Sequence, residues 1–148
     1  MVQKLKISFD DPEFGWVRIN IDSGMFHIYE QLSYISDPFD HIVAALGACT
    51  TRYCSVTVEC ELEPGQLMFS FHGDGGLIRL TISERHRHTK RLFEVKGTFD
   101  EICLPFWRAL RNLQGRFSDD ELSSRMHKPF PSSEMKNLTQ KVELLRGR

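Results

Sequence analysis

The stretch "DPFDHIVAALGACTTRYC", residues 37–54, decides the fold because the spacing of its apolar residues changes twice. Asp37 and Pro38 predict the start of a helix, since aspartate is a favoured N-cap residue and proline fits the first helical turn. The apolar residues that follow recur at three- and four-residue steps, as on a helix with one buried face: Phe39, Ile42, Val43, Leu46 and Cys49. From Cys54 onward, apolar and polar residues alternate, which is typical of a half-buried strand. The stretch therefore predicts a helix between two groups of strands.

The segments before this helix alternate with a period of two. "GWVRINID" places Val17, Ile19 and Ile21 on one face and polar residues on the other. A Ser-Gly turn separates it from a second alternating segment over 25–35, so these two strands are expected to form a hairpin. Residues 4–9, "KLKISF", can add a third strand.

Four further strands are expected after the helix. The segment from Cys54 to Leu62 alternates, and the turn "EPGQ" leads into a return strand. The second tight turn, "GDGG", precedes a third alternating segment. A basic segment, "ERHRHTKR" at 84–91, is expected to be a loop ahead of the last strand, "LFEVKG". These strands should pair as an antiparallel meander.

The last third of the chain is expected to be helical. Two capping-box patterns predict helix starts: Thr98 with Glu101, and Ser118 with Glu121. The helix over 99–114 either kinks at Pro105 or begins near it, since proline removes a backbone hydrogen bond, and Gly115 would suit its end. A final amphipathic helix is expected from Met135 to Leu145.

These elements predict an α+β fold in a single domain, 1–148. The expected order is β-β-β-α-β-β-β-β-α-α, with a short helix between the last two, and the helices should pack on an antiparallel sheet. A chain of 148 residues that is 41% hydrophobic can bury a core without metals or disulfides.

Composition also bounds the cellular setting. The four cysteines lack zinc-site spacing, and the N-terminus lacks an apolar leader segment, so we expect a reduced, cytoplasmic protein without metal or cofactor. The apolar runs are too short to span a membrane. A net charge of −1 gives no bulk attraction to nucleic acid.

Charge is nevertheless polarised along the chain. Residues 1–63 contain ten acids against four bases, a net −6, and the remainder contains fifteen bases against ten acids, a net +5. One interpretation is a set of scattered solvated faces. The other is an acidic patch that steers a basic partner through complementary fields.

Cys49 is the residue most open to a catalytic interpretation. It falls near the C-terminal end of the predicted helix, where the negative end of the dipole disfavours a thiolate, although Arg52 could offset this in part. We interpret it as a small buried apolar residue, with a reactive thiol as the alternative. His86 and His88 could share a strand face as two metal ligands, but the spacing implies no third ligand, and a solvated loop is favoured.

"DPFDHIVAALGACT" resembles the first cysteine helix of the OsmC/Ohr hydroperoxide reductases. The resemblance implies an α+β enzyme in which Cys49 attacks a peroxide and a second cysteine resolves the product. The family's later cysteine-proline pair is missing, because Leu104 separates Cys103 from Pro105. Alternation also resumes at Cys54, which leaves little helix beyond Cys49.

A second resemblance covers about 110 residues. "SYISDPFDHIVAAL", "VTVECELEPGQLMFSF", "LFEVKGTFDEICLPFWRALRNL" and "RMHKPFPSSEMKNL" are similar, in order, to small bacterial immunity proteins of polymorphic-toxin and contact-dependent growth inhibition systems. The matching positions are turn and cap residues: Asp37, Pro38, Glu63, Pro64, Gly65, Phe130 and Pro131.

This second resemblance implies a protein that acts by binding, without catalysis. It would cover the active site of a cognate toxin domain, for example a nuclease, and would not bind nucleic acid or membrane itself. Its oligomeric state stays open. The expected contact residues are acids and aromatics of the early strands, the first helix and the following strand: Asp10, Asp11, Glu13, Trp16, Asp22, Tyr29, Glu30, Asp40, Glu59 and Glu61.

Overall fold

The first three strands form one antiparallel sheet. The computed structural model describes residues 4–147. The strands pair in chain order and are β1 (Lys6–Phe9), β2 (Trp16–Asp22) and β3 (His27–Ser33). Alternation places Val17, Ile19 and Ile21 on the inner face of β2, where each is at most 1% exposed. The predicted three-stranded unit is confirmed.

The first helix follows a single turn of 3₁₀ helix. This turn, η1 (Tyr34–Ser36), leads directly into α1 (Pro38–Ala48), with Cys49 as the C-cap residue. The expected apolar stripe of α1 is buried throughout. The predicted helix between two strand groups is therefore confirmed.

Four longer strands form the second sheet, in which neighbours in the chain pair antiparallel. They are β4 (Tyr53–Glu61), β5 (Gln66–Asp74), β6 (Leu77–Arg85) and β7 (Thr89–Gly97). Gly75 and Gly76 make the predicted turn between β5 and β6, with φ of 65° and 107°, which glycine adopts without steric cost.

Four helices close the chain: α2 (Phe99–Ile102), α3 (Leu104–Arg116), α4 (Asp119–Met126) and α5 (Ser132–Arg146). Both predicted capping boxes are present, at the starts of α2 and α4. The two alternatives at Pro105 are resolved, since α2 ends at Ile102 and Pro105 lies in the first turn of a separate helix.

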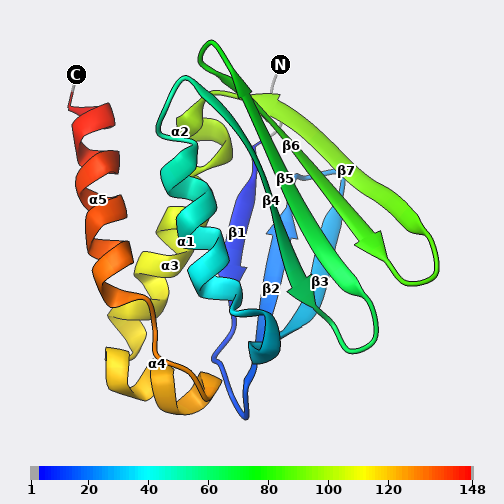
Figure 1. Ribbon diagram of the computed structural model, residues 1–148, viewed down its shortest axis with the longest axis vertical. Coiled ribbons are helices and arrows are strands. Elements are labelled where there is room, and N and C mark those ends of the chain that lie inside the picture. Colours follow the sequence, from blue (N-terminus) through cyan, green and yellow to red (C-terminus); the bar gives the residue numbers. More distant parts are fainter. Residues whose placement is uncertain (1–3, 148) are drawn as a thin grey trace.

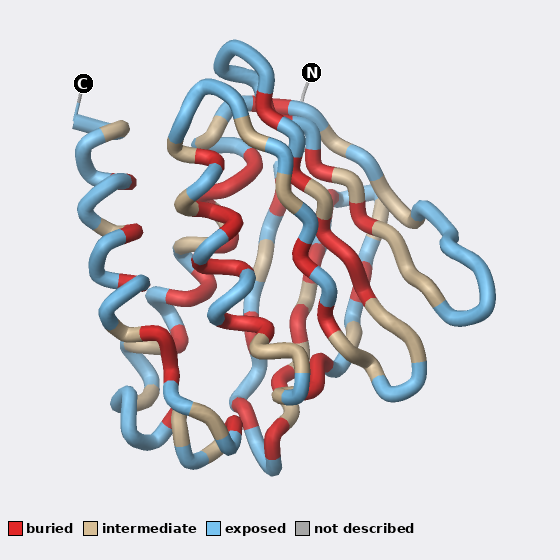
Figure 2. Tube along the Cα trace, in the orientation of Figure 1, coloured by how far each residue is buried: buried red, intermediate tan, exposed pale blue. Residues whose placement is uncertain are grey.

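The helices cover one side of the two sheets (Figure 1). Helix α1 packs against β4, α3 against β1, and α5 against α1 as the outermost layer. The buried residues run along the inner faces of the strands and helices (Figure 2). At the centre, Phe106 of α3 meets the rings of Phe69 and Phe71 edge-on, with centroids 5.7 and 5.6 Å away.

Two local predictions are wrong, and a third, the N-cap at Asp37, is confirmed in position but not in its side-chain bond. Gly115 lies inside α3, which ends at Arg116, because the last helical hydrogen bond runs from Phe117 N to the Leu113 carbonyl at 3.0 Å and spans the glycine. The segment 84–91 is mostly strand, since β6 continues through Arg85 and β7 begins at Thr89. Asp37 holds the N-cap position, but its side chain makes no capping hydrogen bond, because its φ is 48°.

Candidate functional site

The expected contact residues lie in several separate regions. Asp10 and Tyr29 meet on the outer face of the first sheet, where the Tyr29 hydroxyl donates to Asp10 Oδ2 at 2.9 Å. The guanidinium of Arg18 lies 4.4 Å from the centre of the Tyr29 ring. The hydrogen bond to Asp10 raises the pKa of Tyr29. Asp22 ends β2 at the other end of this sheet.

Several predicted acids are paired within the molecule. Asp11 binds Arg116 at 2.6 Å, and Glu13 lies 3.6 Å from Arg125. On the second sheet Glu59 pairs with Arg85 at 3.3 Å. In the same sheet, Gln66 donates to Glu61 at 3.1 Å. Intramolecular pairing lowers the net negative field that these acids present to a partner.

Two predicted acids have a raised pKa. Desolvation, and then the charge of Glu84, raises the pKa of Glu30 on the inner side of β3. Desolvation, and then the charge of Asp37, raises the pKa of Asp40 in the first turn of α1. Neither carboxylate is stabilised in its charged form, as a dedicated ion-pairing residue would be.

Three distant segments converge at one end of the molecule, which we call the hairpin end: residues 13–15, 34–37 and 126–129. Gly15 accepts a hydrogen bond from Tyr34 N through its carbonyl and donates its N–H to the Arg125 carbonyl, both at 2.8 Å. Arg125 also donates to the Pro12 carbonyl at 3.0 Å. These bonds tie the β1–β2 hairpin to η1 and to the end of α4, at the bottom of the view in Figure 1.

Among residues 4–147 four non-glycine residues have a positive φ, and the hairpin end holds three of them: Phe14 (54°), Asp37 (48°) and His127 (62°). Bulky side chains rarely adopt this conformation, which costs about 1–3 kcal/mol, and such residues cluster at functional sites. Surrounding contacts hold them in place. The rings of Tyr34 and His127 meet edge-on, 5.4 Å apart.

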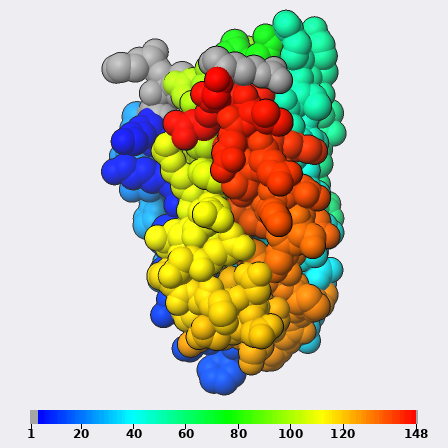
Figure 3. Space-filling model, turned by 90° about the vertical axis from the view of Figure 1, so that its left-hand side faces the viewer, coloured from blue at the N-terminus to red at the C-terminus, as the bar shows by residue number. Residues whose placement is uncertain are grey.

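Two large apolar side chains project from the hairpin end. Phe14 is 81% exposed and Ile35 is 52% exposed. Their segments are adjacent, because Tyr34 binds the backbone of Gly15. Gly15 allows this approach, since a Cβ there would come within 2.6 Å of the Tyr34 ring. In the view of Figure 3 the β1–β2 hairpin protrudes below the helices.

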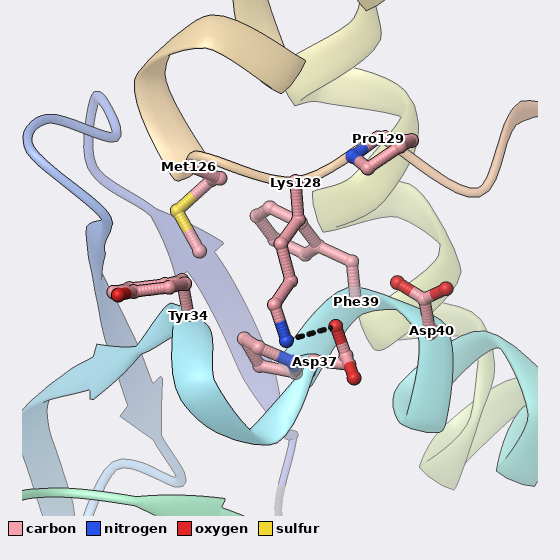
Figure 4. A pocket seen from close by; sticks show the side chains of 8 residues that line it. Tyr34, Asp37, Phe39, Asp40, Met126, Lys128 and Pro129 are labelled. Atoms are coloured by element: carbon pink, nitrogen blue, oxygen red, sulfur yellow. Dashed lines mark ion pairs between the residues drawn. The ribbon is translucent and has the colours of Figure 1, made fainter.

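A small hollow borders the hairpin end (Figure 4). Tyr34, Asp37 and Asp40 line it from one side, and Met126 and Lys128 from the other. Its volume of about 10 Å³ holds one water at most. The ion pair between Lys128 Nζ and Asp37 Oδ1, 2.8 Å long, bridges the two sides. The hollow therefore marks the place where an ion pair connects two segments, and it is too small to bind an organic ligand.

The alternative catalytic residue, Cys49, lies among other thiols. It is 3% exposed, and its Sγ is 3.2 Å from Cys54 Sγ. A hydrogen bond with the Cys103 thiol, and then desolvation, raises the pKa of Cys49 far above its usual range. Desolvation and contact with Cys49 raise the pKa of Cys54 to about 11. These surroundings disfavour the thiolate that a nucleophile requires.

The two histidines of the basic segment do not form a metal site. Among residues 4–147, no three His, Cys, Asp or Glu side chains are grouped to hold a metal ion. His86 instead contacts Glu84, with Nε2 and Oε1 2.5 Å apart.

Comparisons with family models, curated proteins and solved structures find no match. The two family resemblances therefore stay predictions. Within residues 4–147, none of the helices has the length and apolar character needed to cross a bilayer.

Of the contact residues named from the sequence, Glu13 belongs to the hairpin end, Trp16 adjoins it and Asp40 lines its hollow. Phe14, Ile35 and His127 were missed. One signal was available for Phe14. "FG" between two alternating segments matches a two-residue hairpin turn, which needs positive φ at both positions and normally places asparagine or aspartate first. A phenylalanine at the first position of such a turn is unusual, and this makes Phe14 a candidate for a functional role.

Proposed function

We propose that this protein is a bacterial immunity protein that binds and blocks a cognate toxin domain, without catalysis, in the cytoplasm. We further propose that the hairpin end is the centre of its contact surface. The observation that carries the proposal is Phe14, a large aromatic side chain that is 81% exposed and held at φ 54°. Aromatic anchors of this kind dominate binding energy at protein interfaces.

Rigid presentation supports a binding role. The backbone hydrogen bonds of Gly15 and the ion pair of Lys128 with Asp37 fix the three segments before any partner arrives. A pre-organised surface loses little conformational entropy on binding, so more of the contact energy appears as affinity.

The charged neighbours fit a polar rim around an apolar centre. Asp11 and Glu13 shortly precede Phe14 in the chain, and each is already oriented by an arginine of the helical side. Rim charges mainly set the association rate and the choice of partner, whereas a buried central anchor sets the dissociation rate.

The test uses the C-terminal domain of a large toxin encoded beside this gene. Co-expression should rescue cells from that domain, and the two purified proteins should bind at a 1:1 ratio. Phe14→Ala should weaken binding about thirtyfold, the effect of a 2 kcal/mol hot spot.

Leu144→Ala is the matched control, because Leu144 is also apolar and 64% exposed but lies near the far end of α5. It should change affinity less than twofold. Failure of the wild-type protein to rescue cells would contradict the immunity function. Equal binding by the Phe14 and Leu144 variants would contradict the assignment of the surface.

A second candidate function is hydroperoxide reduction by Cys49. The observation in its favour is the neighbouring Cys103, which lies between α2 and α3 and hydrogen-bonds with the Cys49 thiol. Burial of both thiols and the raised pKa of Cys49 oppose it. Hydroperoxide turnover that disappears in Cys49→Ser would establish this candidate in place of the first.

A further inference from the structure

The thiols of Cys49 and Cys54 form a pair that the proposed binding function does not use. Cys49 ends α1, and Cys54 is the second residue of β4, so the pair joins a helix to the neighbouring sheet. The two sulfur atoms are 3.2 Å apart. A disulfide bond requires a sulfur separation of about 2.0 Å, so the atoms have only about 1 Å to close.

We propose that Cys49 and Cys54 are a disulfide-forming oxidation site that reacts with small-molecule disulfides of the glutathione type.

Access to the pair comes from Cys54. This residue is half-buried, whereas Cys49, Cys60 and Cys103 are at most 3% exposed. Gly73 lies directly opposite Cys54 in the register of β4 and β5. A Cβ at Gly73 would come within 2.9 Å of Cys54 Sγ, so the sulfur packs where only a glycine can face it. Cys54 is therefore the thiol that an external disulfide can reach first.

Cys49 borders a surface hollow of about 160 Å³, which Arg52 and Phe99 also line. Cys49 thus lies at the edge of a surface hollow, beside the residues that connect α1 to β4. Small movements of this short connection are enough to bring the two sulfur atoms together.

The reaction proceeds in two exchange steps. In the first, the Cys54 thiolate attacks one sulfur of glutathione disulfide and forms a mixed disulfide. One glutathione thiolate leaves and takes up a proton equivalent to the one that Cys54 released.

In the second step, Cys49 loses its proton and attacks Cys54 Sγ. The Cys49–Cys54 bond forms, the bond to glutathione breaks, and the second glutathione leaves as a thiol. Two protein thiols are oxidised, and one glutathione disulfide is reduced to two glutathione molecules.

The geometry favours the second step over accumulation of the mixed disulfide. Cys49 is already in contact with the sulfur that it attacks. The step is therefore intramolecular, and its high effective concentration offsets the scarcity of the Cys49 thiolate that follows from its raised pKa. The first step is slow at neutral pH, because the pKa of Cys54 is raised to about 11 and the thiolate is scarce. Its rate should increase about hundredfold from pH 7 to pH 9.

The test treats the reduced, full-length protein with glutathione disulfide at pH 9, blocks remaining thiols and digests it with trypsin without reduction. Cleavage after Arg52 separates the two cysteines, which fall in peptides 19–52 and 53–79. We expect these peptides to be linked by a disulfide. Cys49→Ser should instead stop at a glutathione adduct on Cys54, and Cys54→Ser should yield neither product.

Cys60→Ser is the matched control, because Cys60 lies in the same peptide as Cys54 and is fully buried. It should leave the linked peptides unchanged. Linkage of peptide 19–52 to peptide 97–108, which contains Cys103, would overturn the proposal. A wild-type protein that stays reduced or stops at the glutathione adduct, while its near-ultraviolet circular dichroism remains native, would also overturn it.

Discussion

Replacing Phe14 by asparagine should make the protein more stable while weakening its proposed binding. Phe14 adopts φ 54° in a two-residue turn with Gly15, whose φ is 81°. The left-handed conformation costs an ordinary residue about 1–2 kcal/mol, and asparagine tolerates it because its short side chain bonds locally to the backbone. The substitution therefore removes most of this cost.

The loss of burial is small by comparison. Phe14 is 81% exposed, so about one fifth of its side-chain area, roughly 40 Å² of 200 Å², leaves water on folding. At about 25 cal/mol per Å² this contributes at most ~1 kcal/mol, and asparagine retains roughly half of that area. The expected net gain in the free energy of unfolding is about 0.5–1.5 kcal/mol, which raises Tm by roughly 1–6 °C.

Urea unfolding followed by the fluorescence of Trp16 and Trp107 measures this gain. Phe14→Val is the matched control, because valine is apolar but tolerates positive φ poorly, and it should be no more stable than the wild type. A Phe14→Asn variant that loses more than about 1 kcal/mol would refute the reasoning, since it would mean that packing, rather than function, keeps phenylalanine at this position.

Three other perturbations test the fold and its electrostatics. Phe106→Ala should lower the free energy of unfolding by about 3–5 kcal/mol, because it leaves a cavity between two aromatic rings, whereas Leu144→Ala should change it by less than about 0.5 kcal/mol in the same urea titration. Ser118→Ala should cost about 1 kcal/mol and lower Tm, because Ser118 accepts a hydrogen bond from Glu121 N at the start of α4. Glu30→Gln should raise Tm at pH 7 but not at pH 3. The raised pKa of Glu30 means that the folded state disfavours the charged carboxylate, and this penalty is absent below the ordinary pKa of 4.5, where the group is protonated in both states.

The arrangement of elements could be predicted because local signals along the chain agree. Buried positions on α1 followed the three- and four-residue steps, and both capping boxes formed where serine or threonine preceded glutamate by three residues. The expected role of the Asp37 side chain was not met, because a contact between residues far apart in the sequence determines its partner. Asp37 makes no side-chain cap because its φ is 48°, and its carboxylate is instead paired with Lys128, ninety-one positions further along the chain. No local pattern reveals such a partner.

The candidate site was harder to predict for a related reason. Charge counts treated Asp11 and Glu13 as free acids, because a linear sequence does not show that Arg116 and Arg125 fold back on them. The apolar residues at the hairpin end could not be grouped from the sequence either, since the segments that carry Phe14 and Ile35 are joined by the hydrogen bond between Tyr34 and Gly15. Pairing and convergence are properties of the folded chain.

Whether these acids are free or paired with arginines affects how the protein would recognise a partner. If the acids of the early strands were unpaired, long-range attraction would dominate, and binding would fall steeply with salt. Pairing Asp11 and Glu13 with arginines makes each a local dipole whose field decays faster with distance. A surface centred on Phe14 then obtains most of its affinity from burial of apolar area, which salt scarcely weakens. Arginine pairing would therefore shift the basis of recognition from overall charge to the shape of one end of the fold.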